Sequence, residues 1–394
     1  MREVRLGEIA SFRRGVSYRG SDLAESESDG TLMINMKSFS KEGKYRPDGI
    51  KFHNGTFSEK DLIKPNDLVL ANTDLTQEGD ILGAAVMVPP EFRNKNVVGS
   101  HHTTILTMND EHVDPDYLAR VINSEKIRIE IKRYRRGATV KGITSKDLKK
   151  ISIQLPSLAE QKRISSILRM ADDLSINLHN AHAMRDSVAR SIFLEMFGDV
   201  RINDKNHPTM NIGDFCEIVN GSTPRSKEES FWGGEIPWVS PVTLSKLDEP
   251  WLRKPTRLIT KQGYESCSTT MVEKNSILFS SRAPIGLVAI NAMPLCTNQG
   301  FKTLTGFHGQ AEPEYMYQLM KELGGTIASQ GRGATFAEIS KSIMAGVEVP
   351  IPPREEQKRF SSIFKAIYKN RASSNVSCKH GVTMNSSLLQ EMLT

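Results

Sequence analysis

The sequence predicts a mixed α/β (α+β) protein in which one structural unit occurs twice. First, short peptides recur at a fixed separation: Arg136-Gly137-Ala138-Thr139 returns 196 positions later as Arg332-Gly333-Ala334-Thr335. Second, a Glu-Gln-Lys-Arg sequence follows a proline in each half, at 160–163 and at 356–359. Third, short apolar runs bounded by turn residues alternate with amphipathic stretches. Repetition along both halves indicates a duplicated domain and a pseudo-two-fold internal repeat.

The two halves also begin alike. Leu6-Gly7-Glu8-Ile9 and Gly15 in the first half correspond to Ile212-Gly213-Asp214-Phe215 and Gly221 in the second. Between such anchors the halves differ almost completely. A shared scaffold with different decoration is expected of two similar domains that each recognise something different.

Each half opens with a zone in which we expect strands. Short apolar runs bounded by Gly, Pro, Asn or Ser are typical of strands, and they lie at 67–71, 81–88, 276–280 and 285–290. Helical stretches interrupt them, from Pro115 to about Arg133 and from Pro313 to Leu323. We predict a mixed domain with an irregular sheet at 1–155 and another at 203–350.

A long helix is predicted after each zone, at 156–202 and at 351–394. In the first, from about 158 to 197, apolar residues recur in alternating three- and four-residue steps, which is typical of a helix packed along a partner. At about 1.5 Å per residue it would be roughly 60 Å long. In the second, polar residues occupy the seam between 370 and 381, so we expect a bend, fraying or loose pairing there.

We predict that these two helices pair as an antiparallel coiled coil. The alternative is two independent helices, each packed on its own domain. The seam is expected to consist of Ile164, Ile167, Ala171, Leu174, Leu178, Ala181, Val188, Ile192, Phe360, Ile363, Ile367, Met384 and Leu388.

Composition is that of a globular protein with a mildly basic balance. The 394 residues are 38% hydrophobic and 25% charged, with a formal net charge of +6, which is compatible with a polyanionic partner. Basic residues crowd between 128 and 150. The four cysteines have no Cys-x-x-Cys spacing, so we expect buried thiols in a reducing cytoplasm and neither a disulfide framework nor a metal cage. We also expect no signal peptide and no membrane span.

Few patterns in the sequence indicate catalysis. Pro115-Asp116 with Glu130-Ile131-Lys132 is similar to the Pro-Asp…Glu-x-Lys arrangement of metal-dependent nucleases, but the second half has no matching Glu-x-Lys. His101 and His102 would point to opposite faces if they lay on a strand, and we expect no metal site there. A stand-alone nuclease and a non-catalytic coiled-coil scaffold remain as alternative functions.

Several of these motifs together resemble a known family. The two proline-led entries into Glu-Gln-Lys-Arg helices are similar to those of the specificity (S) subunit of Type I restriction-modification enzymes. The second half adds Gly221-Ser222-Thr223-Pro224, Ile236-Pro237-Trp238-Val239 and Thr297-Asn298-Gln299-Gly300-Phe301, which resemble a target recognition domain of that family. The first half departs from this pattern, with Val16-Ser17-Tyr18-Arg19 and Gly99-Ser100-His101-His102 instead, and is expected to be a different subtype.

The resemblance implies a DNA-binding subunit with no catalytic residues of its own. Two target recognition domains would each read half of a bipartite double-stranded DNA sequence, and the paired helices would set the unread spacer. Two modification subunits would bring S-adenosylmethionine and methylate adenine. Restriction subunits would bring ATP and magnesium. The chain itself would bind no cofactor and no metal, and would act in the cytoplasm.

Candidate DNA contacts follow from the repeated motif and from the resemblance. Arginine and threonine suit phosphate or base-edge hydrogen bonds, and glycine allows a close backbone approach. We select Arg136, Thr139 and Lys141 with Arg332 and Thr335 first, then Arg225, Lys227, Arg282, Gln299, Arg19, Lys37, Asn72, Thr73, His101 and His102.

Overall fold

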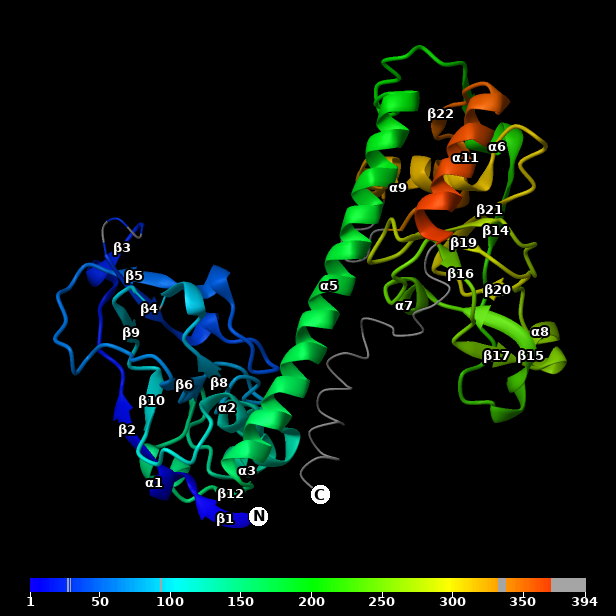
Figure 1. Ribbon diagram of the computed structural model, residues 1–394. Coiled ribbons are helices and arrows are strands. Elements are labelled where there is room, and N and C mark those ends of the chain that lie inside the picture. Colours follow the sequence, from blue (N-terminus) through cyan, green and yellow to red (C-terminus); the bar gives the residue numbers. More distant parts are fainter. Residues whose placement is uncertain (27, 29, 93, 332–337, 370–394) are drawn as a thin grey trace. The chain divides into compact units, whose positions relative to one another are not determined.

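The computed structural model describes the chain except residues 27, 29, 93, 332–337 and 370–394. The chain divides into two compact units, here called unit 1 and unit 2, at residues 175 and 176. This division falls inside one continuous helix, α5 (Leu158–Phe197) (Figure 1). The predicted first long helix, from about 158 to 197, is therefore confirmed as a single element that contributes to both units.

In its described residues, unit 1 contains four α-helices of its own, the first part of α5, and short strands. The helices are α1 (Leu6–Ile9), α2 (Pro115–Asn123), α3 (Glu125–Arg133) and α4 (Ser145–Leu148). The strands are β1 (Arg2–Arg5), β2 (Ala10–Arg14), β3 (Leu23–Ala24), β4 (Thr31–Ile34), β5 (Lys51–His53), β6 (Leu68–Ala71), β7 (Thr73–Asp74), β8 (Ala85–Met87), β9 (Val97–Gly99), β10 (Thr103–Met108), β11 (Lys141–Gly142) and β12 (Ser152–Leu155).

Unit 2 contains the end of α5 and a similar set of elements. Its other helices are α6 (Ile212–Phe215), α7 (Pro241–Leu244), α8 (Lys261–Glu265), α9 (Pro313–Ser329), α10 (Lys341–Ala345) and α11 (Arg354–Lys369). Its strands are β13 (Thr209–Asn211), β14 (Glu217–Asn220), β15 (Trp232–Val239), β16 (Trp251–Leu252), β17 (Arg257–Ile259), β18 (Ile277–Ser280), β19 (Val288–Asn291), β20 (Cys296–Thr297), β21 (Phe301–Thr305) and β22 (Glu348–Pro350).

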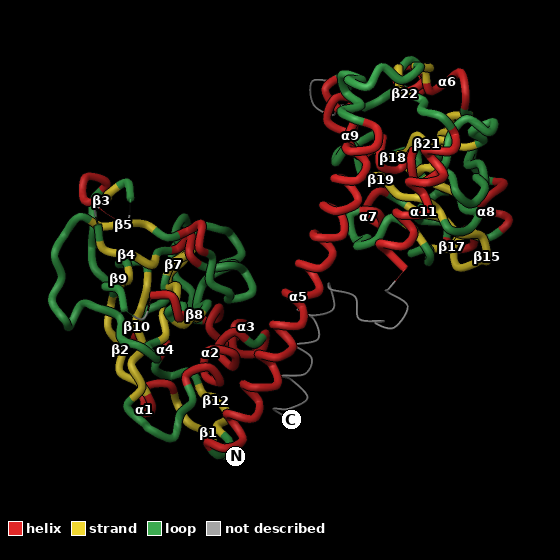
Figure 2. The backbone as a smooth tube through the Cα atoms, turned by 45° about the horizontal axis from the view of Figure 1, so that its top comes forward, coloured by secondary structure: helices red, strands yellow, loops and turns green. Residues whose placement is uncertain are grey.

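In the two units, corresponding strands lie next to one another in the same order within the sheets. An antiparallel sheet β2-β10-β6-β8 in unit 1 corresponds to β14-β21-β18-β19 in unit 2, which β16 extends. A second sheet, β3-β5-β4-β9, corresponds to β17-β15-β20, and each includes one parallel pair, β4 with β9 and β15 with β20. Figure 2 shows these strands within their units. The predicted duplication of a mixed domain with an irregular sheet is confirmed.

The central strand of each main sheet is buried on both faces. In β6, Leu68 and Leu70 belong to one apolar cluster while Val69 belongs to another. In β18, Phe279 and Leu278 are divided in the same way. Successive side chains of a strand point to opposite faces, so a strand covered on both faces is a continuous apolar run, as in the sequence here.

The predicted helical stretches differ in detail. The stretch from Pro115 to Arg133 is two helices, α2 and α3, because Ser124 between them is extended, at φ −62° and ψ 148°. The stretch from Pro313 continues to Ser329 as α9, beyond the predicted Leu323. In the part of the chain that the structure describes, no helix has the length and apolar character needed to cross a membrane.

A buried glutamine joins three segments in unit 1. Gln161, in the second turn of α5, accepts a hydrogen bond from the backbone amide of Asp114 (2.9 Å) through Oε1. Its Nε2 donates to the carbonyls of His112 and Pro156, each at 2.9 Å. Asp114 caps the start of α2, and Pro156 follows β12. The side chain therefore fixes α5 against both the helix and the strand that precede it.

The corresponding glutamine makes the same contacts in unit 2. Gln357 accepts from the amide of Glu312 (2.9 Å) and donates to the carbonyls of Gln310 (3.0 Å) and Pro352 (2.8 Å). It is fully buried, as is Gln161. A buried amide with its donors and acceptor satisfied specifies one arrangement, so the second residue of the repeated Glu-Gln-Lys-Arg sequence is required by the fold.

Within unit 2 the end of α5 and α11 pack antiparallel. Phe193 and Phe197 of α5 contact the ring of Phe360, at centroid distances of 5.4 and 5.7 Å. Asp186, earlier in α5, accepts a hydrogen bond from Tyr368, later in α11. The alternative of two independent helices therefore does not describe this part of the chain.

The residues that pack differ in part from the predicted seam. Ile164 is buried, but in the core of unit 1, together with Leu168, which was not predicted. Ile192, Phe360 and Ile367 pack in the core of unit 2. Val188 is 43% exposed, and Ala189 beside it is buried instead, which corrects the seam at that turn. The predicted three- and four-residue spacing fails at this turn because α5 packs against the whole core of unit 2 and not against α11 alone. That core determines which face of α5 is buried.

The remaining seam positions are placed as follows. Leu174 is 50% exposed, and partial burial is found for Ile167, Ala171, Leu178, Ala181 and Ile363. Met384 and Leu388 lie outside the described residues, as does the polar stretch of the second helix.

We predict that Gln161→Leu and Gln357→Leu each lower the free energy of unfolding of their own unit by about 1–3 kcal/mol or more, because buried backbone groups lose their partners. Hydrogen exchange under increasing denaturant would locate the loss in the unit that carries the substitution. Lys162→Leu, at an exposed position on the same helix, is the control and is expected to change stability by less than about 0.5 kcal/mol. Equal stability of the glutamine variants and the control would contradict the assigned role.

Candidate nucleic-acid interface

In unit 1 a glycine lets two loops meet. Gly15, which follows β2, has no room for a side chain, because a Cβ there would lie 2.2 Å from the carbonyl oxygens of Gly99 and Ser100. The next amide, of Val16, donates to the carbonyl of Gly99 at 2.7 Å. The loop after β2 is thereby fixed against the loop between β9 and β10, which carries His101.

Unit 2 repeats this junction with different residues. A Cβ on Gly221 would lie 2.2 Å from the carbonyl oxygens of Thr297 and Asn298, and the amide of Ser222 donates to Thr297 at 2.9 Å. Gln299 therefore occupies the place that His101 occupies in unit 1. Because the backbone contacts match while the side chains differ, this loop is a position where the two units can differ in what they contact.

Three of the predicted contacts line one hollow of unit 1. The hollow has a volume of about 490 Å³ and is lined by Asn72, Thr73 and Arg136 together with Arg14 and Thr144, among others. Asn72 is buried and donates to Thr104 Oγ1 at 3.2 Å. Its Oδ1 has no partner among the described residues. Predicted residues that are distant in sequence, Asn72 and Thr73 on one side and Arg136 on the other, therefore lie around one hollow.

The Arg-Gly-Ala-Thr sequence of unit 1 forms a tight loop at the edge of this hollow. Arg136 and Gly142 exchange backbone hydrogen bonds of 2.9 and 2.8 Å, and Gly137 between them has φ +95°. The Lys141 ammonium donates to the carbonyls of Gly137 and Ala138. Arg136 forms an ion pair with the buried Asp147 at 3.1 Å but stays 72% exposed. Thr139 is exposed at the tip.

The two histidines lie side by side, which corrects the expectation that they point to opposite faces. His101 and His102 occupy the turn between β9 and β10, and their ring centroids are 3.9 Å apart. Tyr18 packs on His101 at 5.4 Å, and Thr73 Oγ1 lies 2.8 Å from His102 Nδ1. Burial, with help from the Arg14 charge, lowers the pKa of both imidazoles below 6.5. The lowered pKa favours the neutral form of both rings.

The other candidates of unit 1 surround this group. Arg19, exposed, follows Tyr18, and its backbone amide donates to Asp22. Lys37 is exposed and adjoins Met36, whose sulfur accepts from Thr73. The structure therefore connects the first-domain candidates through Tyr18, Thr73 and the histidine turn.

In unit 2 two tryptophans hold the Gly-Ser-Thr-Pro-Arg loop. Trp238 Nε1 donates to the carbonyl of Ser222 (3.0 Å), and Trp232 Nε1 donates to that of Arg225 (3.3 Å). Thr223 donates to Gln299 Oε1 at 2.6 Å. These contacts bring Arg225 and Gln299 into one exposed group, and Lys227 is exposed on the same loop.

Arg282 is engaged by an acidic neighbour. Its guanidinium lies 2.9 Å from Glu338, which also pairs with the buried Lys302 at 3.5 Å. Burial lowers the pKa of the Lys302 ammonium. A backbone bridge joins Arg282 to Glu338, in the place where Thr73 meets Gly142 in unit 1. Arg332 and Thr335 lie outside the described residues.

Two further cations belong to these surfaces and were not predicted. Arg257 of β17 lies over the ring of Trp232, and Lys51 of β5 lies over that of Tyr18. Trp238 was part of the quoted Ile-Pro-Trp motif, but nothing in the sequence singles out Arg257 or Lys51 among 52 basic residues. Arg257 and Lys51 reach their aromatic neighbours only because strands from distant segments of the chain pair with one another.

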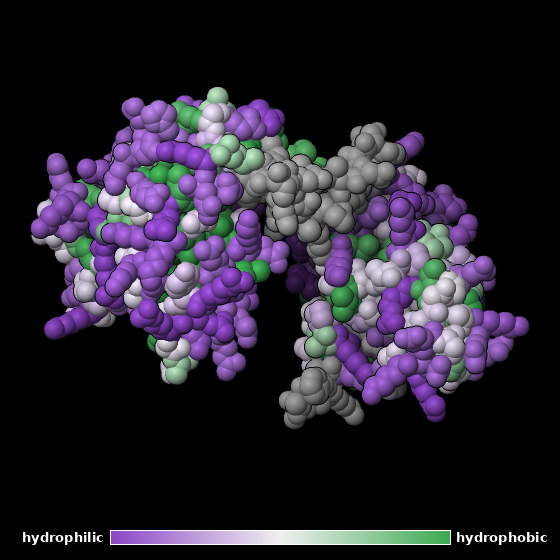
Figure 3. Space-filling view, turned by 90° about the horizontal axis from the view of Figure 1, so that it is seen from below, coloured by the Kyte–Doolittle hydropathy of each residue, from purple (hydrophilic) through white to green (hydrophobic). Residues whose placement is uncertain are grey.

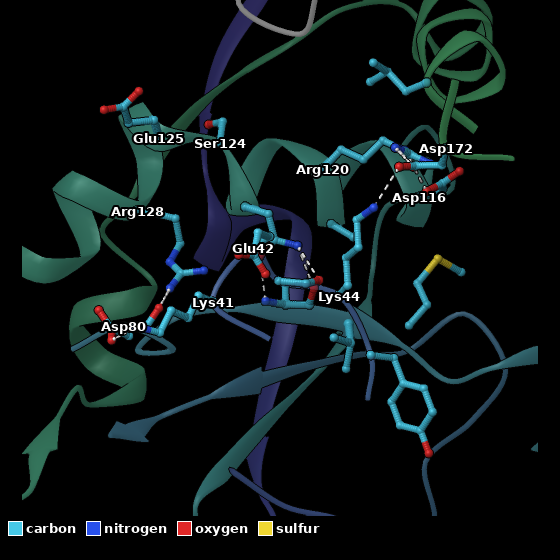
Figure 4. Close-up of a pocket in the computed structure, with 18 of the residues that line it drawn as sticks. Lys41, Glu42, Lys44, Asp80, Asp116, Arg120, Ser124, Glu125, Arg128 and Asp172 are labelled. Atoms are coloured by element: carbon cyan, nitrogen blue, oxygen red, sulfur yellow. Dashed lines mark hydrogen bonds and ion pairs between the residues drawn. The ribbon is translucent and has the colours of Figure 1, made fainter. Parts of the chain in front are cut away.

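A second hollow of unit 1, of about 600 Å³, is lined by none of the predicted DNA contacts (Figure 4). Several of its charges pair with one another: Lys41 with Asp80 (2.7 Å), Lys44 with Asp172 (3.1 Å) and Arg120 with Asp172 (2.9 Å). Such internally paired charge is not the basic surface expected to follow a phosphate backbone.

The nuclease alternative depends on Asp116, which lines this second hollow. Its carboxylate accepts from Arg120 (3.1 Å) and Arg169 (2.7 Å). Glu130 lies on α3 and is not among the lining residues. In the described ranges no group of three or more His, Cys, Asp or Glu side chains is placed to hold a metal ion. The two arginines give Asp116 a structural role in the contact of α2 with α5.

The visible surface is predominantly hydrophilic. Figure 3 shows hydrophobic residues only in small groups on the face in view.

Among the cysteines that are described, Cys216 and Cys296 are buried with free thiols, and burial raises the pKa of Cys216 to about 12. Cys267 is partly exposed, which differs from the expectation of a buried thiol, and Cys378 lies outside the described residues.

Comparison with known proteins identifies both halves. Residues 1–183 and 204–376 match the model of a family described as Type I restriction modification DNA specificity domain. The Type I restriction enzyme MjaIX specificity subunit of Methanocaldococcus jannaschii is 35% identical over 176 residues, which cover 43% of this chain and 40% of that protein. The putative MjaX specificity subunit of the same organism is 24% identical over 294 residues, covering 71% of this chain and 66% of that protein.

A solved structure shares the fold. The crystal structure of a Type I restriction-modification S subunit from M. genitalium matches with a TM-score of 0.66 at 13% identity, and the match covers 100% of this chain and 96% of that one. At this identity the likeness concerns the arrangement of the chain and not its individual contacts.

We predict that acidification destabilises unit 1 through the histidine turn. Between their lowered pKa values and the ordinary value near 6.5, the imidazoles bind fewer protons in the folded chain than in the unfolded chain, so stability falls as the pH falls below about 6.5. The double variant His101→Gln, His102→Gln should lose less stability than the parent between pH 7.5 and 5.5 in thermal unfolding. His179→Gln, at an exposed site on α5, is the control. An unchanged pH dependence in the double variant would refute the prediction.

Proposed function

The chain belongs to the family of Type I restriction modification DNA specificity domains, which it matches twice, and we propose that it is the DNA-recognition subunit of a Type I restriction-modification complex. It would bind double-stranded DNA at a bipartite, asymmetric sequence, with each unit reading one half. This role would place it in the cytoplasm. The domain limits proposed for this function remain 1–155 and 203–350, with spacer helices at 156–202 and 351–394.

The observation that carries this proposal is that one scaffold presents two different polar surfaces. Matching backbone contacts at Gly15 and Gly221 fix loops whose side chains differ: His101 stands in one unit where Gln299 stands in the other. A protein that only joined partners would not need different side chains at corresponding loops. Two readers of different base sequences do need them, because sequence is read by side chains at base edges.

The repeated exposed residues support a partner that binds twice. Gln161 and Gln357 recur for structural reasons, but Lys162 and Lys358 recur beside them while exposed. Exposed residues that the fold does not require, and that both units share, suit one docking surface used twice. We therefore propose two modification subunits, which would carry S-adenosylmethionine and methylate adenine, and restriction subunits, which would carry ATP and magnesium.

Catalysis is assigned to these partners and not to this chain. The nuclease alternative would require DNA cleavage by the purified chain with magnesium alone. The scaffold alternative would require that the chain binds no DNA when its partners are present. Sequencing of methylated bases in DNA from a strain that carries the chain and its modification partner tests all three. We expect a bipartite methylated sequence that disappears when the chain is deleted.

We also propose that the length of α5 between its two packing zones sets the spacer. The first zone ends near Asp172, which pairs with Lys44 of unit 1. The second begins near His182, whose Nδ1 lies 3.7 Å from a carboxylate oxygen of Asp248 in unit 2. The turn after α5 is tied to it, since Lys205 donates to the carbonyl of Met196 at 3.0 Å. Extra residues at 199–206 would therefore fall within unit 2 and leave the helix length unchanged.

We predict that seven residues inserted into α5 after Ser175 lengthen the recognised spacer and leave both half-sites unchanged. Seven helical residues add about 10 Å and turn the helix by only about 20°. At a rise of about 3.4 Å per base pair, the spacer should grow by about three pairs. Methylation sequencing gives the answer directly. An active variant with an unchanged spacer would show that α5 does not set the distance, while an insertion after Asn203 should leave the spacer as it is.

A further inference from the structure

Arg257 lies directly opposite a tryptophan on the small sheet of unit 2. In the antiparallel ladder of β15 and β17, Trp238 pairs with Arg257, so both side chains stand on the same face. Figure 1 shows the two strands side by side. The guanidinium carbon lies 3.5 Å from the centroid of the Trp232 ring and 5.6 Å from that of Trp238. Arg257 is thus stacked against one indole and beside another.

A bulge in β15 makes this stack possible. Both Trp232 and Ile236 pair with Ile259, so the residues between them are looped out of the ladder. Gly233 within the bulge has φ +81°, and a Cβ on Gly234 would lie 2.5 Å from the Cα of Thr260. The bulge returns Trp232 to the same face as Trp238, where the two rings meet edge to face at 5.2 Å.

The tryptophans are themselves anchored. Their indole N–H groups donate to the carbonyls of Arg225 and Ser222, so their polar atoms are satisfied and their ring faces remain for the guanidinium. A planar guanidinium on an aromatic ring keeps its N–H donors at its edge. Arg257 is therefore oriented by stacking, and its donors stay available.

Two other arginines of the candidate surfaces are engaged by carboxylates. Arg136 is paired with Asp147 and Arg282 with Glu338. Arg257 is exposed, and no carboxylate oxygen of the described residues lies within 4 Å of its guanidinium nitrogens. Its charge and its hydrogen-bonding edge are thus uncompensated by the protein, as expected of a group whose acceptor belongs to a ligand.

The same position in unit 1 carries another cation on another aromatic ring. Met33 of β4 pairs with Lys51 of β5, as Trp238 of β15 pairs with Arg257. The Lys51 ammonium lies 5.4 Å from the centroid of the Tyr18 ring. Lys51 likewise forms no ion pair with any carboxylate that the structure describes. The scaffold therefore places a cation over an aromatic ring at one site in each unit, while the cation and the ring differ between the units.

We propose that this position is a base-reading site in each unit, occupied by Arg257 in unit 2 and by Lys51 in unit 1. The ligand is a base edge in the major groove of double-stranded DNA. A guanidinium fork matches the two acceptors of guanine, O6 and N7, and an ammonium donates to the same acceptors as a single point. This inference rests on the proposed function, since it names the residues that would give each half-site part of its sequence.

The experiment compares methionine variants in the methyltransferase assembled from the full chain and its modification subunits. Binding is titrated with DNA that carries the recognised sequence, with every single-base-pair substitution of both half-sites, and with unrelated DNA. Arg257→Met should weaken binding to the recognised sequence by about 5- to 150-fold and abolish the preference for one G·C pair in one half-site. Lys51→Met should abolish a preference in the other half-site only.

Two further variants separate base reading from charge and packing. Arg253→Met is the matched control, because Arg253 also lies over a tryptophan, Trp251, but is paired with Glu249; its preferences should be those of the parent. Arg257→Lys keeps the charge, so it should retain binding to unrelated DNA and lose part of the preference at the same base pair as Arg257→Met.

Three results would overturn the proposal. Affinity lost equally on all sequences, with a salt slope reduced by about 0.9 per contact, would make Arg257 a phosphate contact. Preferences unchanged in Arg257→Met and Lys51→Met would give both residues a packing role only. Effects of both variants on the same half-site would refute the correspondence of the two positions. If the parent complex shows no sequence preference, the proposed function itself fails.

Discussion

The arrangement of each unit depends on one buried side-chain amide. Gln161 and Gln357 use their single acceptor and both donors to connect the start of a long helix to the chain before a second helix and to the chain after a strand. Because these groups are out of contact with water, an alternative helix direction would leave them unsatisfied. α5 and α11 are therefore each fixed relative to the sheet that precedes them in the chain, and so are the loops that the sheet supports.

The candidate surfaces differ at places where this scaffold needs only backbone contacts. The loops at Gly15 and Gly221 are held by carbonyl and amide groups, so the side chains that follow are free to differ. At the paired strands β4–β5 and β15–β17 the register is shared, but Lys51 on Tyr18 in one unit becomes Arg257 on Trp232 in the other. A duplicated scaffold of this kind can present two chemically different surfaces with little change in fold.

Much of the fold was predictable because the repeat marks corresponding positions and because apolar runs mark the strands buried on both faces. α5 was predicted nearly to the residue, since its proline-led start and its long periodic stretch are local signals. Val188 was misplaced because the core of unit 2, assembled from distant segments, selects Ala189 and Phe193 for burial. The site was only partly predictable: Asn72, Thr73 and Arg136 do share one hollow, whereas Arg257 and Lys51 have no local signal, since strand register alone gives them their aromatic neighbours.

The central claim, that one scaffold used twice reads two independent half-sites, is tested most directly by exchanging a single unit. Residues 1–155 would be replaced by the equivalent part of another specificity subunit, with Gln161 and the whole of α5 retained. Methylated-base sequencing of DNA from a strain that carries the hybrid chain gives the recognised sequence. The account predicts that one half of the sequence changes while the other half and the spacer stay the same. A change in both halves would contradict it.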